Sequence, residues 1–430
     1  MAIKTITVTN FKSFKNISVN LGMFNVLIGA NASGKSNFVQ IFKFLRDLAT
    51  YGIENAISMQ GGPEYLINIK AKNPRILSIE FSTDFPYSAE NYLYSDEPTM
   101  GFKVYETTYC LKLNFGESIS RFVIEDDRII YMCNFGSYYL KKDELLLKKF
   151  LGQGKIIISK KGDNFSLDVE GPKEIIKELD NISEIKYGRD LFNRLKVMKE
   201  TRLIIENPYL YYFDNNARKE LQQIAVYDFD PKLSKRPQMI SGRADLEEDG
   251  SNLAVVINNL VRTGNKRKLC DLLTGILPFI DNVYTRRVAN TLIFHIKEKY
   301  HATKFLPSFL VSDGTMNLTA LILALFFEKK SLKIIEEPER NIHPYLISRV
   351  MDMMKDTSEK EQILTTSHNP EVVRYSDPSN ILLAKRSDQG FTDIFRPVEY
   401  KDIKTFLNSE MGMSELYTQR LLEAYTKNAT

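Results

Sequence analysis

The sequence "IGANASGKSN" at residues 28–37 decides the fold. It places Gly29, four further residues, and then Gly34, Lys35 and Ser36, which is the spacing of a phosphate-binding loop. Glycines let backbone N–H groups turn toward a phosphate without a Cβ in the way. The lysine can reach the β- and γ-phosphates, and the serine hydroxyl can bind Mg²⁺. The stretch therefore predicts a site for a nucleoside triphosphate with Mg²⁺.

The residues on either side of this loop support the prediction. Residues 23–28, "MFNVLI", have the composition of a buried strand, and residues 37–48 repeat apolar side chains at helical spacing. Strand, glycine loop and helix therefore follow in the required order, and the helix N-terminus adds partial positive charge beside the phosphates. The alternative is a glycine-rich turn that matches by chance, and this context disfavours it.

Length and composition limit the classes of protein to which the chain can belong. A chain of 430 residues exceeds one typical domain, so we expect a core with insertions. Charged residues make up 26% and hydrophobic residues 43%, which is ordinary for a folded protein. The net charge of +4, from 58 basic and 54 acidic residues, is too mild to predict nucleic-acid binding but leaves room for a local basic patch.

Several features indicate the compartment. Three cysteines without paired spacing fit a reducing cytosol and no metal site built on cysteine. The N-terminus enters a strand-like pattern directly, with no signal-peptide pattern, and the longest apolar run, 318–327, is too short to span a bilayer. We therefore expect a soluble, cytoplasmic protein with no membrane association.

The order of predicted elements is typical of an α/β protein with a β-rich insertion. Residues 2–28 are predicted as strands, 37–50 as a helix, and 64–170 as mostly short strands separated by Gly, Asn and Asp. Helices are then predicted within 172–225 and at 252–262 and 268–280. Residues 228–251, which are rich in Pro, Gly and charge, are predicted as a loop, and 290–299 returns to strand. Residues 291–430 alternate helix and strand. The chain must fold back on itself if this last part completes the nucleotide site.

An apolar strand followed by two acids stands at residues 331–344, "SLKIIEEPERNIHP". Such a strand can deliver carboxylates to Mg²⁺ and to water. Glu336 would hold the Mg²⁺ shell, and Glu337 would orient or deprotonate the attacking water. The alternative is a pair of exposed acids at a helix start, where the helix dipole favours them.

His368 follows another predicted strand, in "ILTTSHNPEVV" at 363–373. Histidine can donate a hydrogen bond to a γ-phosphate oxygen near neutral pH, so the position fits a γ-phosphate sensor. A lone histidine is more often structural, which is the alternative here.

A third stretch, 309–327, opens a long apolar helix with Ser312, Asp313, Gly314 and Thr315. In one interpretation Ser312 or Asp313 is only the N-cap. In the other, the serine hydroxyl and the loop N–H groups form a second anion site. Because one chain has no evident use for two γ-phosphate sites, the second interpretation implies two chains, each of which caps the ATP of the other.

The ordered set of "GANASGKSN", "VSDGT", "IIEEPERNIHP" and "TTSHNP" resembles the ABC-type ATPases of the SMC, RecF and overcoming-lysogenization-defect group, which are often labelled AAA family ATPases. "FKSF" at 11–14, "AVYDFDP", "LEEDGSNLAVVINNLV" and "GMSELYTQRLL" resemble stand-alone ATPases of that group. The resemblance covers about 1–85 and 205–425. It implies an α/β fold: an ABC-type P-loop ATPase head with an antiparallel β lobe and a helical insertion. It also implies three parts: an N-terminal part of the head at 1–85, a β-rich lobe with a helical insertion at 86–290, and a C-terminal part of the head at 291–430.

The resemblance also implies roles for single residues. Glu337 and His368 would be catalytic, and Ser36 and Glu336 would bind Mg²⁺. Lys12 and Ser13 would line the base or phosphate side of the nucleotide, while Ser312 and Gly314 would serve the γ-phosphate of a partner chain. The full set of expected nucleotide contacts is Gly29, Asn31, Ser33, Gly34, Lys35, Ser36, Asn37, Lys12, Ser13, Ser312 and Gly314.

The sequence departs from the family pattern in several places. The signature is Val-Ser-Asp-Gly-Thr rather than Leu-Ser-Gly-Gly-Gln, and Glu336 replaces the more usual aspartate. Arg340-Asn341 stands where Asn-Gly is common, and because asparagine tolerates a left-handed backbone we expect the turn to survive. Gln60 is a candidate for the glutamine that usually contacts Mg²⁺, although a loop glutamine is usually only solvated.

The resemblance implies a slow ATPase that uses ATP and Mg²⁺ and forms a head-to-tail homodimer or higher oligomer. No long coiled coil separates the halves, and no acidic cluster follows His368, so we expect neither a chromosome-scale clamp nor a fused nuclease.

Two hypotheses about the function follow. In the first, the chain is a nucleotide-dependent switch or scaffold for a separately encoded effector or nuclease, in antiviral defence. In the second, it is a RecF-like ATPase that acts on DNA. Basic residues at 262–268 and at Arg286-Arg287 mildly favour DNA contact, and a solvated loop is the alternative.

Overall fold

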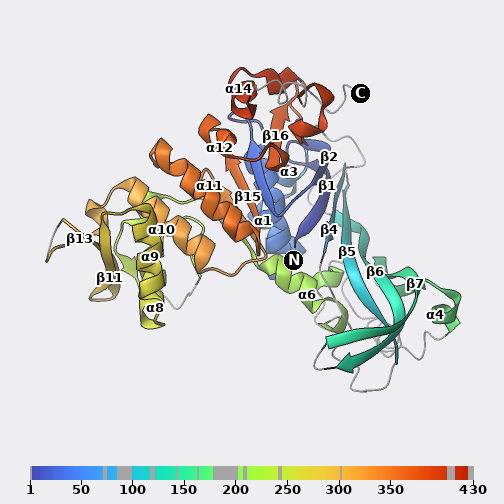
Figure 1. Cartoon of the computed structure of the whole chain (residues 1–430). Helices are drawn as coiled ribbons and strands as arrows, with labels where there is room; N and C mark the ends of the chain where they lie inside the picture. Colours follow the sequence, from blue (N-terminus) through green and yellow to red (C-terminus); the bar gives the residue numbers. More distant parts are fainter. Residues whose placement is uncertain are drawn as a thin grey trace. The chain divides into compact units, whose positions relative to one another are not determined.

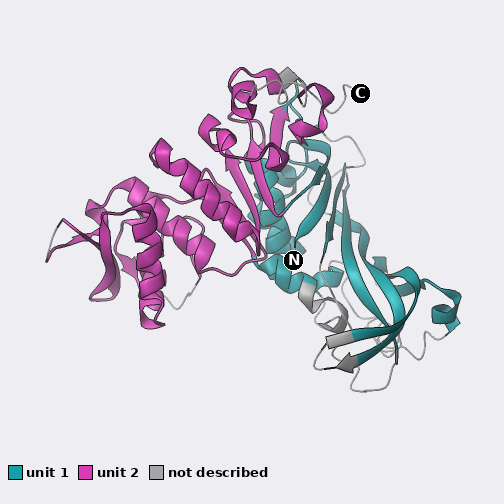
Figure 2. Cartoon of the chain, in the orientation of Figure 1, with its two compact units in different colours: residues 1–22, 36–223, 386–394 teal, residues 23–35, 224–385, 395–430 magenta. Residues whose placement is uncertain are grey.

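The computed structural model describes residues 2–70, 75–84, 99–116, 122–141, 144–161, 164–177, 202–206, 211–240, 245–300, 303–403 and 412–424 (Figure 1). The chain forms two compact units, coloured teal and magenta in Figure 2. The first unit comprises 1–22, 36–223 and 386–394, and the second comprises 23–35, 224–385 and 395–430. Each unit is therefore assembled from segments that lie far apart in the sequence. The three-part division expected from the sequence stays a prediction.

The second unit is built on five parallel strands in the order β16-β3-β15-β14-β9. Their bounds are β3 (Phe24–Ile28), β9 (Ile224–Tyr227), β14 (Leu332–Glu336), β15 (Gln362–Ser367) and β16 (Ile381–Arg386). Every residue of β3 and β15 is buried, as expected for strands covered on both faces. The predicted folding back of the chain is confirmed, since β3 from the start of the sequence pairs with β15 and β16 from its end.

Register brings the ends of three strands together at one edge of this sheet. Ser367 on β15 pairs with Ile28 on β3, and Thr366 pairs with Glu336 on β14. Because parallel strands end at the same edge, the segments that follow them emerge side by side there. These segments are the phosphate loop, the acids after β14 and His368.

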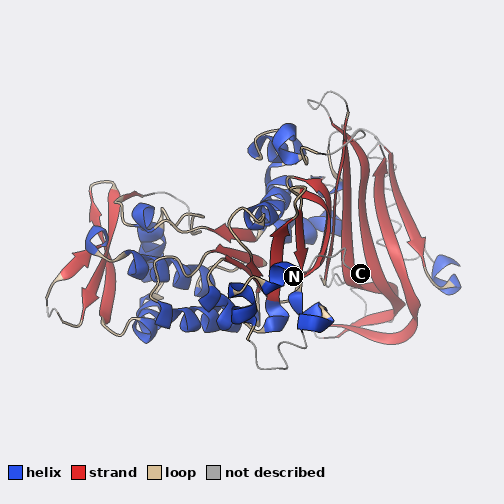
Figure 3. Cartoon of the chain, turned by 90° about the horizontal axis from the view of Figure 1, so that it is seen from above, coloured by secondary structure: helices blue, strands red, loops and turns tan. Residues whose placement is uncertain are grey.

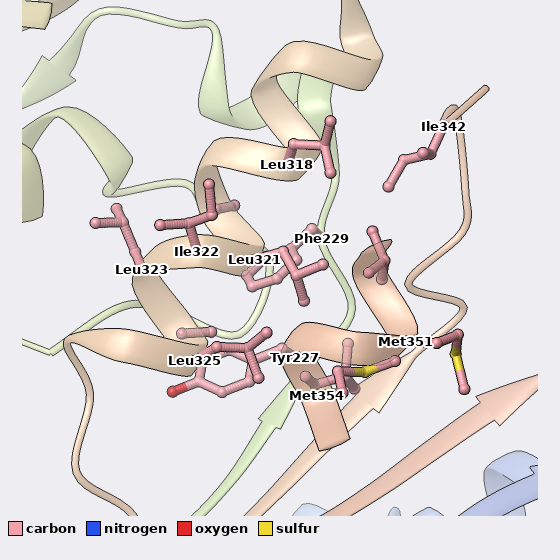
Figure 4. Packing of buried hydrophobic residues seen from close by; sticks show 14 of the residues in the cluster. Tyr227, Phe229, Leu318, Leu321, Ile322, Leu323, Leu325, Ile342, Met351 and Met354 are labelled. Atoms are coloured by element: carbon pink, nitrogen blue, oxygen red, sulfur yellow. The ribbon is translucent and has the colours of Figure 1, made fainter. Parts of the chain in front are cut away.

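Helices pack on this sheet through a continuous apolar core. The main ones are α10 (Asp313–Phe326) and α11 (Pro344–Ser358). Figure 4 shows side chains of α10, Met351 and Met354 of α11, and the aromatic rings of Tyr227 and Phe229 gathered in this core. The two rings are stacked with centroids 5.4 Å apart. Every residue of α10 from Thr315 to Leu325 is buried, so this helix is held from all sides.

A smaller antiparallel sheet completes the second unit. Its order is β10-β12-β11, and β13 pairs with β12. The elements are β10 (Gln238–Met239), β11 (Ile280–Val288), β12 (Thr291–Glu298), β13 (Phe305–Pro307) and the helices α8 (Leu253–Arg262) and α9 (Lys266–Ile276). The helix predicted at 252–262 is confirmed, but the one predicted to run to residue 280 ends at Ile276 and is followed by a strand. Pro278 explains the difference, because it cannot continue a helix and disfavours helical geometry at the residue before it.

The first unit is built on a seven-stranded antiparallel sheet in the order β2-β1-β4-β5-β6-β7-β8 (Figure 3). Its strands are β1 (Ile3–Phe11), β2 (Phe14–Asn20), β4 (Arg75–Thr83), β5 (Thr99–Phe115), β6 (Phe122–Lys141), β7 (Glu144–Lys161) and β8 (Asn164–Glu170). The predicted antiparallel β lobe is therefore confirmed. The helices are α1 (Lys35–Tyr51), α2 (Ile53–Met59), α3 (Pro63–Leu66), α4 (Lys173–Lys177), η2 (Ile204–Glu206) and α6 (Tyr211–Gln222).

Strands β6 and β7 are longer than the short segments predicted for this region. Register shifts within β6 absorb irregular positions without ending the strand. Gly136 and Gly154 lie inside these strands rather than between them. A Cβ at Gly136 would lie 2.4 Å from the carbonyl oxygen of Lys149, so the glycine permits a close approach of two backbones.

Aromatic side chains attach α1 to the hairpin of β1 and β2. The ring centroids of Phe11 and Phe44 are 6.0 Å apart, and those of Phe14 and Phe38 are 6.3 Å apart. All four rings are buried. The hairpin that carries Lys12 and Ser13 is therefore fixed on the helix that carries Ser36 and Asn37.

The remaining described elements are short. They are α7 (Pro231–Ser234), η4 (Ser308–Leu310), α12 (Pro370–Arg374), η5 (Pro378–Asn380), β17 (Thr392–Phe395), η6 (Pro397–Glu399), α14 (Met413–Thr418) and η7 (Leu421–Ala424). Among the described helices, none is long and apolar enough to cross a bilayer.

Candidate nucleotide site

Lys35 is held inside the phosphate loop. Its Nζ donates hydrogen bonds to the carbonyl oxygens of Gly29, at 2.8 Å, and Ala30, at 3.0 Å. Burial lowers the pKa of Lys35, and the negative charges of Glu337, Glu339 and Glu336 oppose that effect. The ammonium group is thus directed onto carbonyl groups of its own loop, within electrostatic reach of three carboxylates.

The backbone of this loop excludes a side chain at Gly29. A Cβ at Gly29 would lie 2.5 Å from the carbonyl oxygen of Ala384 and 2.6 Å from Oγ of Ser33. Ala32 and Gly34 have φ values of 62° and 106°. Turns of this kind direct successive N–H groups to one side, as in anion-binding concavities. The loop therefore fits the phosphates that its sequence predicts.

Glu337 has both carboxylate oxygens engaged. His368 Nδ1 lies 2.9 Å from Oε1, and Arg340 Nη2 donates to Oε2 at 3.1 Å. Burial alone would raise the pKa of Glu337, but the hydrogen bonds from Arg340 and His368 and the electrostatic interactions with these two groups outweigh it and hold the pKa below its usual value. The acid and the histidine that the sequence analysis singled out are therefore in direct contact.

The backbone at Glu337 is left-handed, with φ of 45°. This conformation is uncommon for a residue with a side chain, and such residues concentrate at functional sites. Its N–H donates to the carbonyl oxygen of Thr366 on β15 at 3.0 Å, which fixes the strained residue against the neighbouring strand.

Glu339 is a buried third carboxylate that the sequence analysis did not single out. The hydroxyl of Ser367 donates to its Oε1 at 2.5 Å, and the N–H of Asn369 donates to the Ser367 hydroxyl at 2.9 Å. Burial raises the pKa of Glu339 despite this hydrogen bond. The spacing "EEPE" was the available signal, since it places a third acid two residues after Glu337.

Ser312 is the N-cap of α10. Its Oγ accepts a hydrogen bond from the N–H of Thr315 at 3.2 Å, so the capping interpretation holds. Ser312 is also exposed, so the cap leaves the residue accessible.

The start of α10 contacts the turn after β14. A Cβ at Gly314 would lie 2.4 Å from the carbonyl oxygen of Asn341, and Asn317 Nδ2 donates to the carbonyl oxygen of Arg340 at 2.5 Å. Asn341 has φ of 61°, which confirms that this asparagine takes the left-handed conformation expected of it.

The other predicted contacts, Lys12, Ser13, Ser36 and Asn37, belong to the first unit. Asn37 Nδ2 and Thr392 Oγ1 both donate to Oγ of Ser13, at 2.8 and 2.9 Å. Lys12, Ser13 and Asn37 border a recess of about 720 Å³ in the first unit, whereas Ser36 is not part of its lining. Its lining is Lys12, Ser13, Asn37, Gln60, Gly61, Tyr65, Asn68, Ile69, Lys70, Arg386, Gly390 and Phe391.

The recess is cationic and partly aromatic. Lys12, Lys70 and Arg386 line it without any carboxylate among the described residues around it, and Lys70 Nζ lies 5.4 Å from the centre of the Phe391 ring. Burial lowers the pKa of Lys12. Gln60 lines the same recess as Asn37, and its Oε1 is buried without a partner in the described part of the chain. Sequence patterns gave no signal for Lys70 or Phe391.

Comparison with known proteins was made on sequence and on structure. A search of curated proteins finds no match. The similar solved structures include an SMC head bound to the C-winged helix domain of ScpA, with 14% identity and a TM-score of 0.48 over 92% of this chain and 98% of that chain. Another is the SMC head domain from Thermotoga maritima, with 13% identity and a TM-score of 0.44 over 92% of this chain and 99% of that chain. A further one is an SMC head domain with an extended coiled coil, bound to the C-terminal domain of ScpA, from Pyrococcus furiosus, with 13% identity and a TM-score of 0.44 over 95% of this chain and 99% of that chain.

One protein family matches residues 24–104 and 215–374, which is more than half of the chain. Its description is "AAA domain, putative AbiEii toxin, Type IV TA system". The matched residues include the phosphate loop, α10, the acids after β14 and His368. The chain therefore belongs to this AAA-domain family.

Proposed function

We propose that the chain binds ATP with Mg²⁺ at the phosphate loop and hydrolyses it slowly, with Glu337 as the general base. The observation that carries this proposal is the contact of Glu337 with His368 at the sheet edge where the phosphate loop also emerges. A general base must lie within hydrogen-bond reach of its proton donor, and a carboxylate beside a phosphate loop meets that need once water enters.

Each predicted residue has a distinct task in this proposal. Lys35 leaves the carbonyl groups of Gly29 and Ala30 and pairs with the β- and γ-phosphates, which satisfies its buried charge better than neutral carbonyls do. Ser36 and Glu336 would hold Mg²⁺, and the ion would supply positive charge against the phosphate oxygens. His368 contacts the γ-phosphate and, through its hydrogen bond with Glu337, couples the presence of the γ-phosphate to the position of that carboxylate.

Asn31, Ser33, Gly34 and Asn37 contribute contacts around the phosphates. Lys12 and Ser13 serve the base or phosphate side of the nucleotide, and the cationic recess of the first unit supports this role, since it has the size and charge to hold part of a nucleotide.

We further propose that two copies assemble head to tail around two ATP molecules. Ser312 and Gly314 of one chain would contact the γ-phosphate bound by the other. Support comes from the exposed position of Ser312 at the start of the 14-residue helix α10, whose N–H groups favour an anion.

The dimer would act as a nucleotide-dependent switch for a separately encoded effector, in antiviral defence. The description of the family, which names a toxin–antitoxin system, supports a role of this kind. RecF-like action on DNA, association with a nuclease and a cytoplasmic location stay predictions.

The test compares three variants in ATP binding and in phosphate release. Lys35→Ala should lose both, because the positive charge that would pair with the phosphates is gone. Glu337→Gln should bind ATP normally but lose at least about a hundredfold in kcat, because an amide keeps the shape and cannot accept a proton.

The matched control is Glu359→Gln, which changes an exposed glutamate just after α11 and should behave as the parent. Parent-like turnover in Glu337→Gln, or no turnover in the parent with Mg²⁺ present, would contradict the proposal.

A further inference from the structure

Arg340 joins two carboxylates that come from different strands. Its Nη2 donates to Glu337 Oε2 at 3.1 Å, and its Nη1 donates to Asp228 Oδ1 at 2.8 Å. Glu337 follows β14, and Asp228 follows β9, which pairs with β14. The guanidinium group is therefore fixed between the ends of two neighbouring strands.

Asp228 and Arg340 are themselves restrained by hydrogen bonds of their backbone groups. The N–H of Asp228 donates to the carbonyl oxygen of Glu248 at 2.9 Å. The backbone of Arg340 is held by Asn317, whose amide donates to its carbonyl oxygen at 2.5 Å. The Arg340 N–H in turn donates to the carbonyl oxygen of Glu337 at 3.0 Å, which closes the turn. The contacts with Glu337 and Asp228 and the hydrogen bonds of the Arg340 backbone together determine the position of the guanidinium group.

Stability does not explain the bridge. The side chains of Arg340 and Asp228 are 39% and 50% exposed, and ion pairs at that exposure contribute only about 0–1 kcal/mol. The bridge does, however, determine how the Glu337 carboxylate is turned. With Oε2 on Arg340, Oε1 faces His368, and rotation about the last side-chain bond would break both contacts.

We propose that Arg340, anchored by Asp228, is a positioning residue for Glu337 that fixes the carboxylate in the orientation needed to activate water. This inference rests on the proposed ATPase function. Arg340 acts through Glu337, to which its guanidinium group donates a hydrogen bond. An arginine is suited to the task because its planar group offers two nitrogen atoms in fixed directions, whereas a lysine offers one point charge.

The experiment measures kcat and KM for ATP in four variants. Arg340→Met keeps much of the length of the side chain and removes the guanidinium group. We expect kcat to fall by about tenfold to a hundredfold while KM changes little, because misplacement of a catalytic group affects the chemical step. Arg340→Lys should recover part of the loss. Asp228→Asn should lower kcat by a smaller factor in the parent and should have no further effect in Arg340→Met, because Asp228 acts only through Arg340.

The matched control is Arg349→Met, which removes an arginine on α11 that donates to the carbonyl oxygen of Gly275 at 2.6 Å. It should keep the parent kcat. A thermal melt of each variant shows whether it is folded, and Arg340→Lys provides a second, milder change if Arg340→Met is not.

Two results would overturn the inference: a parent-like kcat in Arg340→Met, or effects of Arg340→Met and Asp228→Asn that simply multiply in the double variant. Failure of the underlying function looks different. If either of these results appears while the parent hydrolyses ATP and Glu337→Gln does not, the proposed function stands and only the role of Arg340 is refuted. If Glu337→Gln is as active as the parent, the proposed function fails, and this inference fails with it.

Discussion

Asp127 is a fully buried carboxylate within the long strands of the first unit. It accepts hydrogen bonds from the Tyr109 hydroxyl at 3.0 Å and from the N–H of Ile204 at 2.6 Å. Burial raises the pKa of Asp127 to about 7, although these hydrogen bonds and the charge of Lys160 act in the opposite direction, and nearby Glu206 adds to the rise. One side chain thus links strands β5 and β6 to the η2 segment.

The raised pKa predicts a pH dependence of stability. The folded state binds a proton at Asp127 up to about pH 7, whereas the unfolded chain releases it near the ordinary aspartate pKa of 3.8. The stabilisation is therefore complete below the unfolded pKa and is lost as pH rises through the folded pKa, with a slope of at most about 1.4 kcal/mol per pH unit. In denaturant unfolding, parent stability relative to Asp127→Asn should fall between about pH 4 and pH 7 and then level off. A constant difference across that range would show that Asp127 does not titrate there.

At the scale of elements, the start of α10 and the turn after β14 behave as one packed unit. A Cβ at Gly314 would lie 2.4 Å from the carbonyl oxygen of Asn341. Because Asn341 directly follows Arg340, a shift of this carbonyl group would also displace Arg340. Gly314→Ala should therefore destabilise the protein by about 1–3 kcal/mol, as overpacking does, and should lower kcat.

Gly275 on α9 provides the matched control. A Cβ there would meet nothing within 4 Å, so Gly275→Ala should raise stability by about 0.5–1 kcal/mol through the helix propensity of alanine. Thermal melts of both variants test the pair. Gly314→Ala with the stability and kcat of the parent would mean that the contact with Asn341 imposes no constraint.

Local patterns predicted most elements of the fold. Strand β3, helix α1 and helix α8 carry unbroken apolar patterns, and the structure places them as predicted. The long strands β6 and β7 could not be predicted in full. Glycine and aspartate normally end strands, and here they lie inside them because distant backbones approach them closely or donate hydrogen bonds to them, which no local pattern reveals.

The candidate site likewise contains some residues that the sequence could predict and others that it could not. Lys35, Glu337 and His368 lie in contiguous motifs, so the sequence could predict them. Arg340 and Asp228 are ordinary charged residues whose partnership exists only because β9 pairs with β14. The recess of the first unit is likewise assembled from separate segments, so its residues carry no common sequence signal. Predictions about residues 178–200, where a helix was expected to continue, lie outside the described residues.

At the scale of the whole molecule, the central claim is that each working site is shared by two chains. The phosphate loop and Glu337 would come from one chain, and Ser312 and Gly314 from the other. Lys35→Ala would then damage one half of a site, and Ser312→Arg would damage the other half, because a bulky cation at the exposed cap would block closure without affecting ATP binding to a single chain.

The most direct test is the ATPase rate of Lys35→Ala and Ser312→Arg mixed in varying ratios. In a mixed dimer, one site combines the intact phosphate loop of the Ser312→Arg chain with the intact signature of the Lys35→Ala chain, while the second site lacks both. The account predicts that each variant alone is inactive and that the mixture recovers activity, greatest near equal amounts. A mixture no more active than its parents, although mixed dimers are shown to form, would contradict the shared site and the role assigned to Ser312.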